Sequence, residues 1–200
     1  MPTPDLLQFL DIRRSTPSRL LGPPGPDDTT LLRMLQTAVR VPDHGKLVPF
    51  RFLRIRGDAR HALGEALVAR ARDLDPDASS AVLEKDRARF SHAPLIVTVI
   101  ARLDARHKVP EQEQLLSAGC VCFALLQSAQ ALGFGAQWLT GWAAYDAAIC
   151  GILGLQADEK IVGFIHIGTP RMEAPERDRP DAAALLGDWD PSVASPSNHA

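Results

Sequence analysis

Apolar residues recur along the chain at two spacings, one typical of helices and one typical of strands. Short apolar segments rich in β-branched residues predict strands over residues 50–55, 95–101, 136–139 and 161–168. Apolar positions three and four residues apart predict helices that end near Arg13 and Pro42, and further helices over residues 59–74, 83–90, 111–132 and 146–153. Helices therefore come first, and strands alternating with helices follow.

This order favours an α+β fold with a central mixed sheet of about four or five strands flanked by helices. The segment LIVTVIA (95–101) is typical of a strand buried on both faces. The long helix over 111–132 is more apolar than one face of a monomer of this size requires, so we expect it in the core of a dimer. A doubly wound fold is the competing architecture, because helical crossovers also join parallel strands.

The chain of 200 residues is long enough for one core, and no internal repeat or linker divides its first 170 residues. After Pro170 the sequence becomes polar and rich in proline. We therefore predict one domain over residues 1–170 and a C-terminal arm or tail over residues 171–200.

Composition narrows the classes of partner. A net charge of -2 gives no support for nucleic acid or an anionic membrane surface. The N-terminus lacks the pattern of a secretory signal and no apolar stretch reaches the roughly 18 residues of a membrane span, so we expect a cytoplasmic protein. Three cysteines in apolar surroundings are typical of reduced, buried thiols, and no metal site is predicted.

Common catalytic motifs do not occur. The sequence has no complete G-x-G-x-x-G, phosphate-binding P-loop, zinc-protease or nucleophile-elbow pattern. Polar or aromatic clusters instead stand at the predicted ends of elements: Arg13-Arg14-Ser15, Arg40 to His44, Gln137 to Trp142, and Gly168-Thr169-Pro170. Paired guanidinium groups can hold a phosphate, but taken alone Arg13 and Arg14 are better explained as a solvated helix end. Turn chemistry and strand-end packing are the corresponding alternatives for the other clusters.

The order of these clusters is more specific than any one of them. The segments RRS, RVPDHGKLVPFRFLRI, HKVPEQEQLLSAGCVCFALLQSAQALGFGAQWLTG and KIVGFIHIGTP together resemble the flavin-dependent nitroreductase family. The likeness is greatest to its small NAD(P)H nitroreductases of the YdjA type, and it extends from about Leu6 to Pro170.

The resemblance implies an α+β homodimer that binds FMN at the subunit interface. It implies that Arg13, Arg14 and Ser15 hold the phosphate and ribityl end of FMN, and that Arg40 and His44 reach the cofactor from the other subunit. Further, Trp138, Leu139 and Thr140 would border the flavin ring. The weakest of these assignments gives Ser128, Ala129, Gln130, Ala131, Leu132 and Gly133 to NAD(P), because the same segment is also the buried end of a helix.

One position departs from the family pattern. Leu139 stands where the small members tend to carry an arginine between the tryptophan and the hydroxyl residue, so one cation is lost beside the flavin.

The implied activity is a ping-pong cycle in which NAD(P)H reduces FMN and a nitroaromatic, quinone or similar small acceptor then takes two electrons. Because the flavin carries this chemistry, no catalytic residue of the protein is needed. A flavin-binding or sensing protein with little turnover is the alternative.

Overall fold

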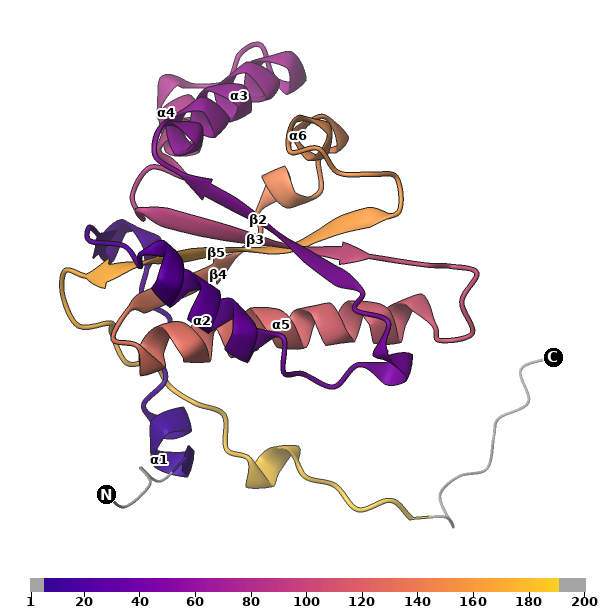
Figure 1. Cartoon of the computed structure of the whole chain (residues 1–200). Coiled ribbons are helices and arrows are strands. Elements are labelled where there is room, and N and C mark those ends of the chain that lie inside the picture. The colour runs from indigo at the N-terminus through magenta and orange to yellow at the C-terminus, as the bar shows by residue number, and fades with distance from the viewer. Residues whose placement is uncertain (1–5, 191–200) are drawn as a thin grey trace.

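The computed structural model describes residues 6–190 and contains one five-stranded sheet with helices on both faces (Figure 1). The strands are β1 (Leu21–Gly22), β2 (Phe50–Arg56), β3 (Leu95–Arg102), β4 (Gly135–Leu139) and β5 (Glu159–Pro170). The α-helices are α1 (Leu6–Asp11), α2 (Asp28–Ala38), α3 (Asp58–Leu74), α4 (Ser80–Ala88), α5 (Glu111–Ala131) and α6 (Ala147–Ile152).

Strand β5 is the centre of the sheet. It pairs with β3, with β4 and, at its last two residues, with β1, while β2 pairs with the other edge of β3. All of these pairings are antiparallel. The predicted α+β class with four or five strands is confirmed, and the competing doubly wound fold is excluded.

The expectation of a mixed sheet was wrong. Helix α5 does connect two strands that run in the same direction, β3 and β4, as a crossover should. Both strands, however, pair with β5, which lies between them. The parallel pair is therefore separated by one antiparallel strand.

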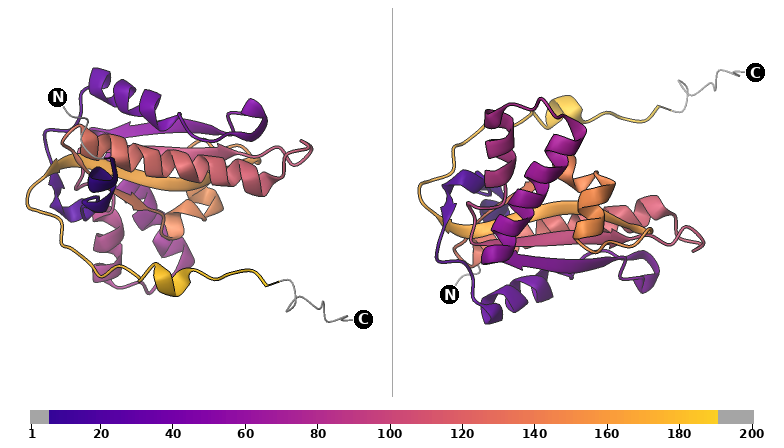
Figure 2. Two further views of the ribbon diagram at one scale, coloured as in Figure 1. Left: turned by 90° about the horizontal axis from the view of Figure 1, so that it is seen from below. Right: turned by 90° about the horizontal axis from the view of Figure 1, so that it is seen from above.

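Two cores lie on opposite faces of the sheet because side chains alternate along each strand. Ile165 and Ile167 point into a core formed with α2 and α5. Phe164 belongs to the other core, which α3 and α6 cover together with the segment after α4. Figures 1 and 2 show α2 and α5 on one side of the sheet and α3, α4 and α6 on the other.

Helix α5 lies flat against the sheet along almost its full length (Figure 1). It ends where Gly133 adopts a φ of +81°, and the N–H of Phe134 then closes the helix by donating to the carbonyl of Ala129 at 2.9 Å. Among the described helices, α5 alone has the length and composition to cross a membrane. Half of that apolar window is buried inside the fold, as expected of a core helix.

Among the differences between the predicted elements and the structure, two concern α4 and β1. Helix α4 begins at Ser80 rather than residue 83, because the hydroxyl of Ser79 accepts a hydrogen bond from the N–H of Val82. The short strand β1 lies outside the segments that were predicted to be strands. Beyond β5, residues 171–190 run over the outside as a mostly exposed arm with one 3₁₀ turn, Ala183–Leu185, and residues 191–200 lie outside the described part (Figure 1).

Candidate active site

The segment that carries Arg13-Arg14-Ser15 leaves α1 and runs beside β4. The N–H of Thr16 donates to the carbonyl of Ala136 at 3.0 Å, and the N–H of Ser18 donates to Oε1 of Gln137 at 2.5 Å. These bonds attach the predicted phosphate-binding segment to the strand whose end carries Trp138, Leu139 and Thr140. Two of the predicted clusters are thus brought together.

The C-terminal arm returns to the same place. Arg14 forms an ion pair with Glu176, and Nη2 of Arg179 lies 3.1 Å from Oε1 of the same carboxylate. Partial burial lowers the pKa of Arg13, and the positive charges of Arg179 and Arg177 lower it further. We call Arg13, Arg14, Arg177 and Arg179, with Glu176, the arginine cluster.

Positive charge predominates in the arginine cluster. The backbone N–H of Arg177 lowers the pKa of Glu176, as do Arg14 and Arg179, so this carboxylate is ionised at neutral pH. It offsets one of four guanidinium charges. The Nε of Arg14 is buried and has no hydrogen-bond partner among the described residues. A bound phosphate would supply both the missing acceptor and the missing negative charge.

Arg13 is held by an aromatic ring of α5. Its guanidinium carbon lies 6.0 Å from the centroid of Phe123, at the outer limit of a cation–π contact, and its Nη1 lies 3.5 Å from Oγ of Ser15. The arginine pair is therefore not simply a solvated helix end.

A second feature, which we call the basic cleft, lies between the 3₁₀ turn Ser18–Leu20, the end of α4 and β4. It has a volume of about 320 Å³. Four of its side chains are basic or can become so, and its lining consists of Pro17, Ser18, Arg19, Lys85, Ala88, Arg89, His92, Gln137 and Leu139. The segment after Ser15 thus connects the arginine cluster to a cleft that attracts anions.

Three residues at the end of β4 point in different directions. Leu139 lines the basic cleft. Trp138 points elsewhere: its indole covers Gly163 on β5 and donates from Nε1 to the carbonyl of Val162 at 3.0 Å. Thr140 is half-buried just after the strand.

A fully buried histidine lies beside the cleft. His166 is the cross-strand partner of Gln137 and stacks on Phe90 with a centroid distance of 5.7 Å. Neither ring nitrogen has a hydrogen-bond partner among the described residues. Desolvation lowers the pKa of His166 to about 4, with the charges of His92 and Arg89 adding to the effect. The buried ring is therefore neutral at physiological pH.

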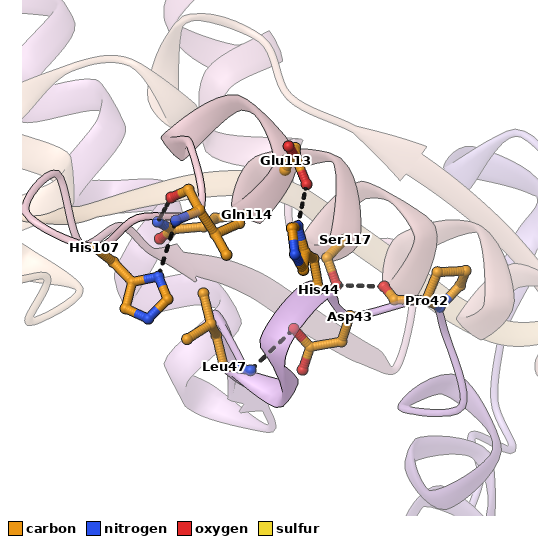
Figure 3. A network of polar contacts seen from close by, with 9 residues as sticks. Pro42, Asp43, His44, Leu47, His107, Glu113, Gln114 and Ser117 are labelled. Carbon is orange, nitrogen blue, oxygen red and sulfur yellow. Dashed lines mark hydrogen bonds and ion pairs between the residues drawn. The ribbon is translucent and has the colours of Figure 1, made fainter.

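The segment containing His44 is fixed to the other end of α5 (Figure 3). Nδ1 of His44 lies 2.7 Å from Glu113, and the hydroxyl of Ser117 donates to the carbonyl of Pro42 at 2.8 Å. Arg13 contacts α5 ten residues later, at Phe123, which corresponds to roughly 15 Å along the helix axis. Within one chain, His44 and Arg13 therefore contact well-separated parts of α5.

Arg40 is exposed and lines a hollow of about 340 Å³ between α1 and α5. Ser128 and Ala131, from the segment assigned to NAD(P), line the same hollow. Gln130 and Gly133 line a neighbouring hollow with Arg14. The hydroxyl of Ser128 is buried and donates to the carbonyl of Ala124 at 2.8 Å, which is a structural role within the helix. Ala129 is also buried, whereas Leu132 is exposed.

Sequence reasoning missed several cleft and cluster residues. Arg177 and Arg179 lie in a segment without periodicity, and Lys85, Arg89 and His92 lie in a charged helix end. The signals available were the alternating acidic and basic residues in APERDRP and the repeated basic positions in EKDRARFSH. For neither segment does the sequence alone show which other residues its basic side chains lie against.

The chain matches the Nitroreductase family model over residues 11–169 and belongs to that family of oxidoreductases. It is 36% identical over 170 residues to the "Putative NAD(P)H nitroreductase YdjA" of Escherichia coli strain K12, covering 85% of this chain and 91% of that protein. It is 33% identical over 175 residues to the "Putative NAD(P)H nitroreductase" of Haemophilus influenzae, covering 87% and 92%.

Solved structures show the same fold. A nitroreductase-like family protein from Bacillus cereus superposes with a TM-score of 0.79 at 20% identity and covers 95% of this chain and 98% of its own. A putative nitroreductase from Desulfovibrio desulfuricans, solved in complex with FMN, has a TM-score of 0.71 at 25% identity and covers 96% and 100%.

Proposed function

We propose that the protein is an FMN-dependent NAD(P)H oxidoreductase that reduces nitroaromatics, quinones or similar small acceptors by two electrons in a ping-pong cycle. The observation that carries the proposal is the arginine cluster. It gathers guanidinium groups from both ends of the folded chain and leaves a buried donor of Arg14 without a partner in the described part of the chain. A phosphate monoester fits this donor set and charge.

The chain's own residues have separable roles in this proposal. Arg13, Arg14 and Ser15 hold the phosphate and ribityl end, assisted by Arg177 and Arg179 from the arm. The basic cleft receives the ring beside Leu139. FMN, when bound, supplies hydride acceptance from NAD(P)H and two-electron donation to the acceptor. The segment 128–133 is the proposed contact for the nicotinamide nucleotide.

A homodimer completes the site. Arg40 and His44 are proposed to reach the cofactor of the partner subunit, since within their own chain His44 is held at the opposite part of α5 from Arg13. An exposed apolar surface supports this assembly: Leu115 and Leu116 of α5 border a hollow of about 780 Å³ shared with α6. Phe123 of α5 is exposed as well.

Residues 1–170 are proposed as the FMN-binding domain and residues 171–200 as an arm that closes the arginine cluster. A cytoplasmic location is proposed as well, because NAD(P)H is an intracellular reductant. The three unpaired cysteines are compatible with a reducing compartment.

The proposal is tested by FMN titration of the purified protein and of Arg13→Ala/Arg14→Ala. The double variant should lose binding by about a hundredfold or more and stay colourless, while its circular dichroism and dimer mass are unchanged. Arg106→Ala/Lys108→Ala removes the same charge from an exposed loop and should bind normally. Unchanged FMN content in the arginine variant would disprove the phosphate site.

Turnover is tested separately. Mixing the yellow protein with NADH or NADPH in a stopped-flow instrument should bleach the flavin absorbance, and an added quinone or nitroaromatic should restore it. A yellow protein that neither nucleotide bleaches would instead be the flavin-binding or sensing alternative.

A further inference from the structure

One arginine in the basic cleft is held by a buried carboxylate. Nη2 and Nε of Arg89 both donate to Oδ1 of Asp86, at 2.7 and 3.2 Å. Asp86 is only 4% exposed, and the indole Nε1 of Trp142 donates to its two oxygens at 3.1 and 3.3 Å. Three donors from two elements therefore fix the carboxylate, and the carboxylate fixes the guanidinium.

The remaining edge of the guanidinium points away from Asp86. Nη1 of Arg89 lies 2.7 Å from the position that a Cβ on Gly141 would occupy, so it reaches the turn that follows β4. Arg89 also lines the basic cleft with Leu139, which contributes no charge there. Among the described residues, Asp86 engages only Nε and Nη2 of Arg89, and Nη1 forms no hydrogen bond.

Comparison with Arg60 distinguishes a ligand-directed arginine from a structural one. Nη1 of Arg60 donates to the carbonyls of Ser91 and Ala93, both at 2.7 Å, and Nε donates to the carbonyl of Gly57. Both nitrogens of Arg60 that form hydrogen bonds therefore donate to backbone carbonyls. Arg89 instead uses one side of its fork on Asp86, and its other side lies at the turn of Gly141, while the side chain lines the cleft.

We propose that Arg89 is the cation that stabilises the negative charge of the reduced flavin ring, with Asp86 and Trp142 as positioning residues that aim its free N–H edge at the ring. This inference rests on the proposed function. A donor that is already oriented where charge develops needs no reorganisation when electrons arrive. Because Asp86 offsets part of the charge of Arg89, we expect a preference for reduced over oxidised FMN of about tenfold rather than many hundredfold.

The test measures the midpoint potential of FMN bound to each variant, by equilibration with a reference dye, together with the dissociation constant of oxidised FMN. Arg89→Met should lose about tenfold of the preference for the reduced form, which corresponds to a potential lower by about 30 mV for a two-electron couple. Arg89→Lys, which keeps the charge, should recover part of the loss. Trp142→Phe should show a smaller shift in the same direction, because Asp86 loses one donor.

The matched control is Arg87→Met. Arg87 lies on the same helix but pairs with Glu65 and Glu84 at 2.7 and 2.8 Å, and it does not line the cleft. This variant should keep the wild-type potential. Melting temperatures of all variants identify any loss of fold, and Arg89→Lys and Trp142→Phe still test the inference if Arg89→Met unfolds.

The outcomes separate the two proposals. If the wild-type protein binds no FMN, the proposed function fails. If the wild-type protein binds FMN and NAD(P)H bleaches it, but the Arg89 variants keep the wild-type potential, the proposed function stands and the role of Arg89 is overturned. Equal shifts in the Arg87 and Arg89 variants would likewise overturn it, because the effect would then be general surface charge.

Discussion

Arg14 and Glu176 form an ion pair although 162 positions separate them in the sequence. This pair brings the C-terminal arm against the segment that follows α1, and with it Arg177 and Arg179. A polar segment that looks like a tail in the sequence thereby becomes part of the candidate site.

The first prediction concerns the arm. Arg177→Ala/Arg179→Ala should weaken FMN binding about tenfold or more, because two charge-assisted contacts to the phosphate are lost. The dependence of the dissociation constant on salt concentration should also become less steep. Fluorescence titration at two salt concentrations measures both effects, and Arg106→Ala/Lys108→Ala is the control. Equal affinities in the arm variant and the control would exclude the arm from the site.

The second prediction has the opposite sign. Glu176 neutralises part of the arginine cluster and competes with an incoming phosphate for Arg14 and Arg179. Glu176→Gln should therefore strengthen FMN binding severalfold. Glu65→Gln removes a carboxylate from the remote ion pair with Arg87 and should leave FMN affinity unchanged. If Glu176→Gln weakens binding as much as the arm variant, its carboxylate serves to place the arm rather than to compete.

The sequence alone was sufficient for much of the sheet. The segments at 95–101 and 161–168 are largely apolar because β3 and β5 are covered on both faces. The direction of strand pairing was not readable, since a helix between two strands does not reveal a third strand that returns between them. The position of β5 between β3 and β4 depends on tertiary packing.

For a related reason, the sequence did not reveal the site residues that lie outside the familiar motifs. Arg89 looks like an ordinary charged residue at a helix end, and only the fold shows Trp142 and Asp86 beside it. His166 looks like part of an apolar strand, and its lack of a hydrogen-bond partner depends on what covers it. Such roles arise from contacts between distant segments, which local patterns do not encode.

The third prediction uses two glycines with similar backbones. Gly141 has φ +67° and ψ −177°, and Gly57 has φ +57° and ψ −138°, so alanine at either position should cost about 1–3 kcal/mol of stability. A Cβ at Gly141 would also collide with Arg89, whereas nothing lies within 4 Å of one at Gly57. FMN affinity should therefore fall in Gly141→Ala only, by an amount that titration compares directly. Equal affinities would show that Arg89 moves aside freely.

The fourth prediction concerns pH. The pKa of His166 is about 4 in the folded protein and near 6.5 when unfolded, so the unfolded chain binds the extra proton between these values. Stability should fall as the pH is lowered from 6.5 to 4, by roughly 3 kcal/mol from this group. His166→Leu should reduce that slope in urea unfolding measured across the range, and exposed His61→Leu should not. A slope unchanged by His166→Leu would mean that other groups control the acid transition.

The fifth prediction tests the dimer through its apolar surface. Leu116 on α5 is 61% exposed and Leu74 at the end of α3 is 58% exposed, so the two leucines are matched in type and accessibility. If α5 packs against a partner, Leu116→Glu places a charge in a dry interface, and light scattering at micromolar concentration should show monomers. Leu74→Glu should remain dimeric. Because the proposed site takes Arg40 and His44 from the partner, Leu116→Glu should also lose FMN, and adding more protein should restore mass and colour together. A monomeric wild-type protein that binds FMN tightly would contradict the shared site, since the contacts from one chain would then be sufficient.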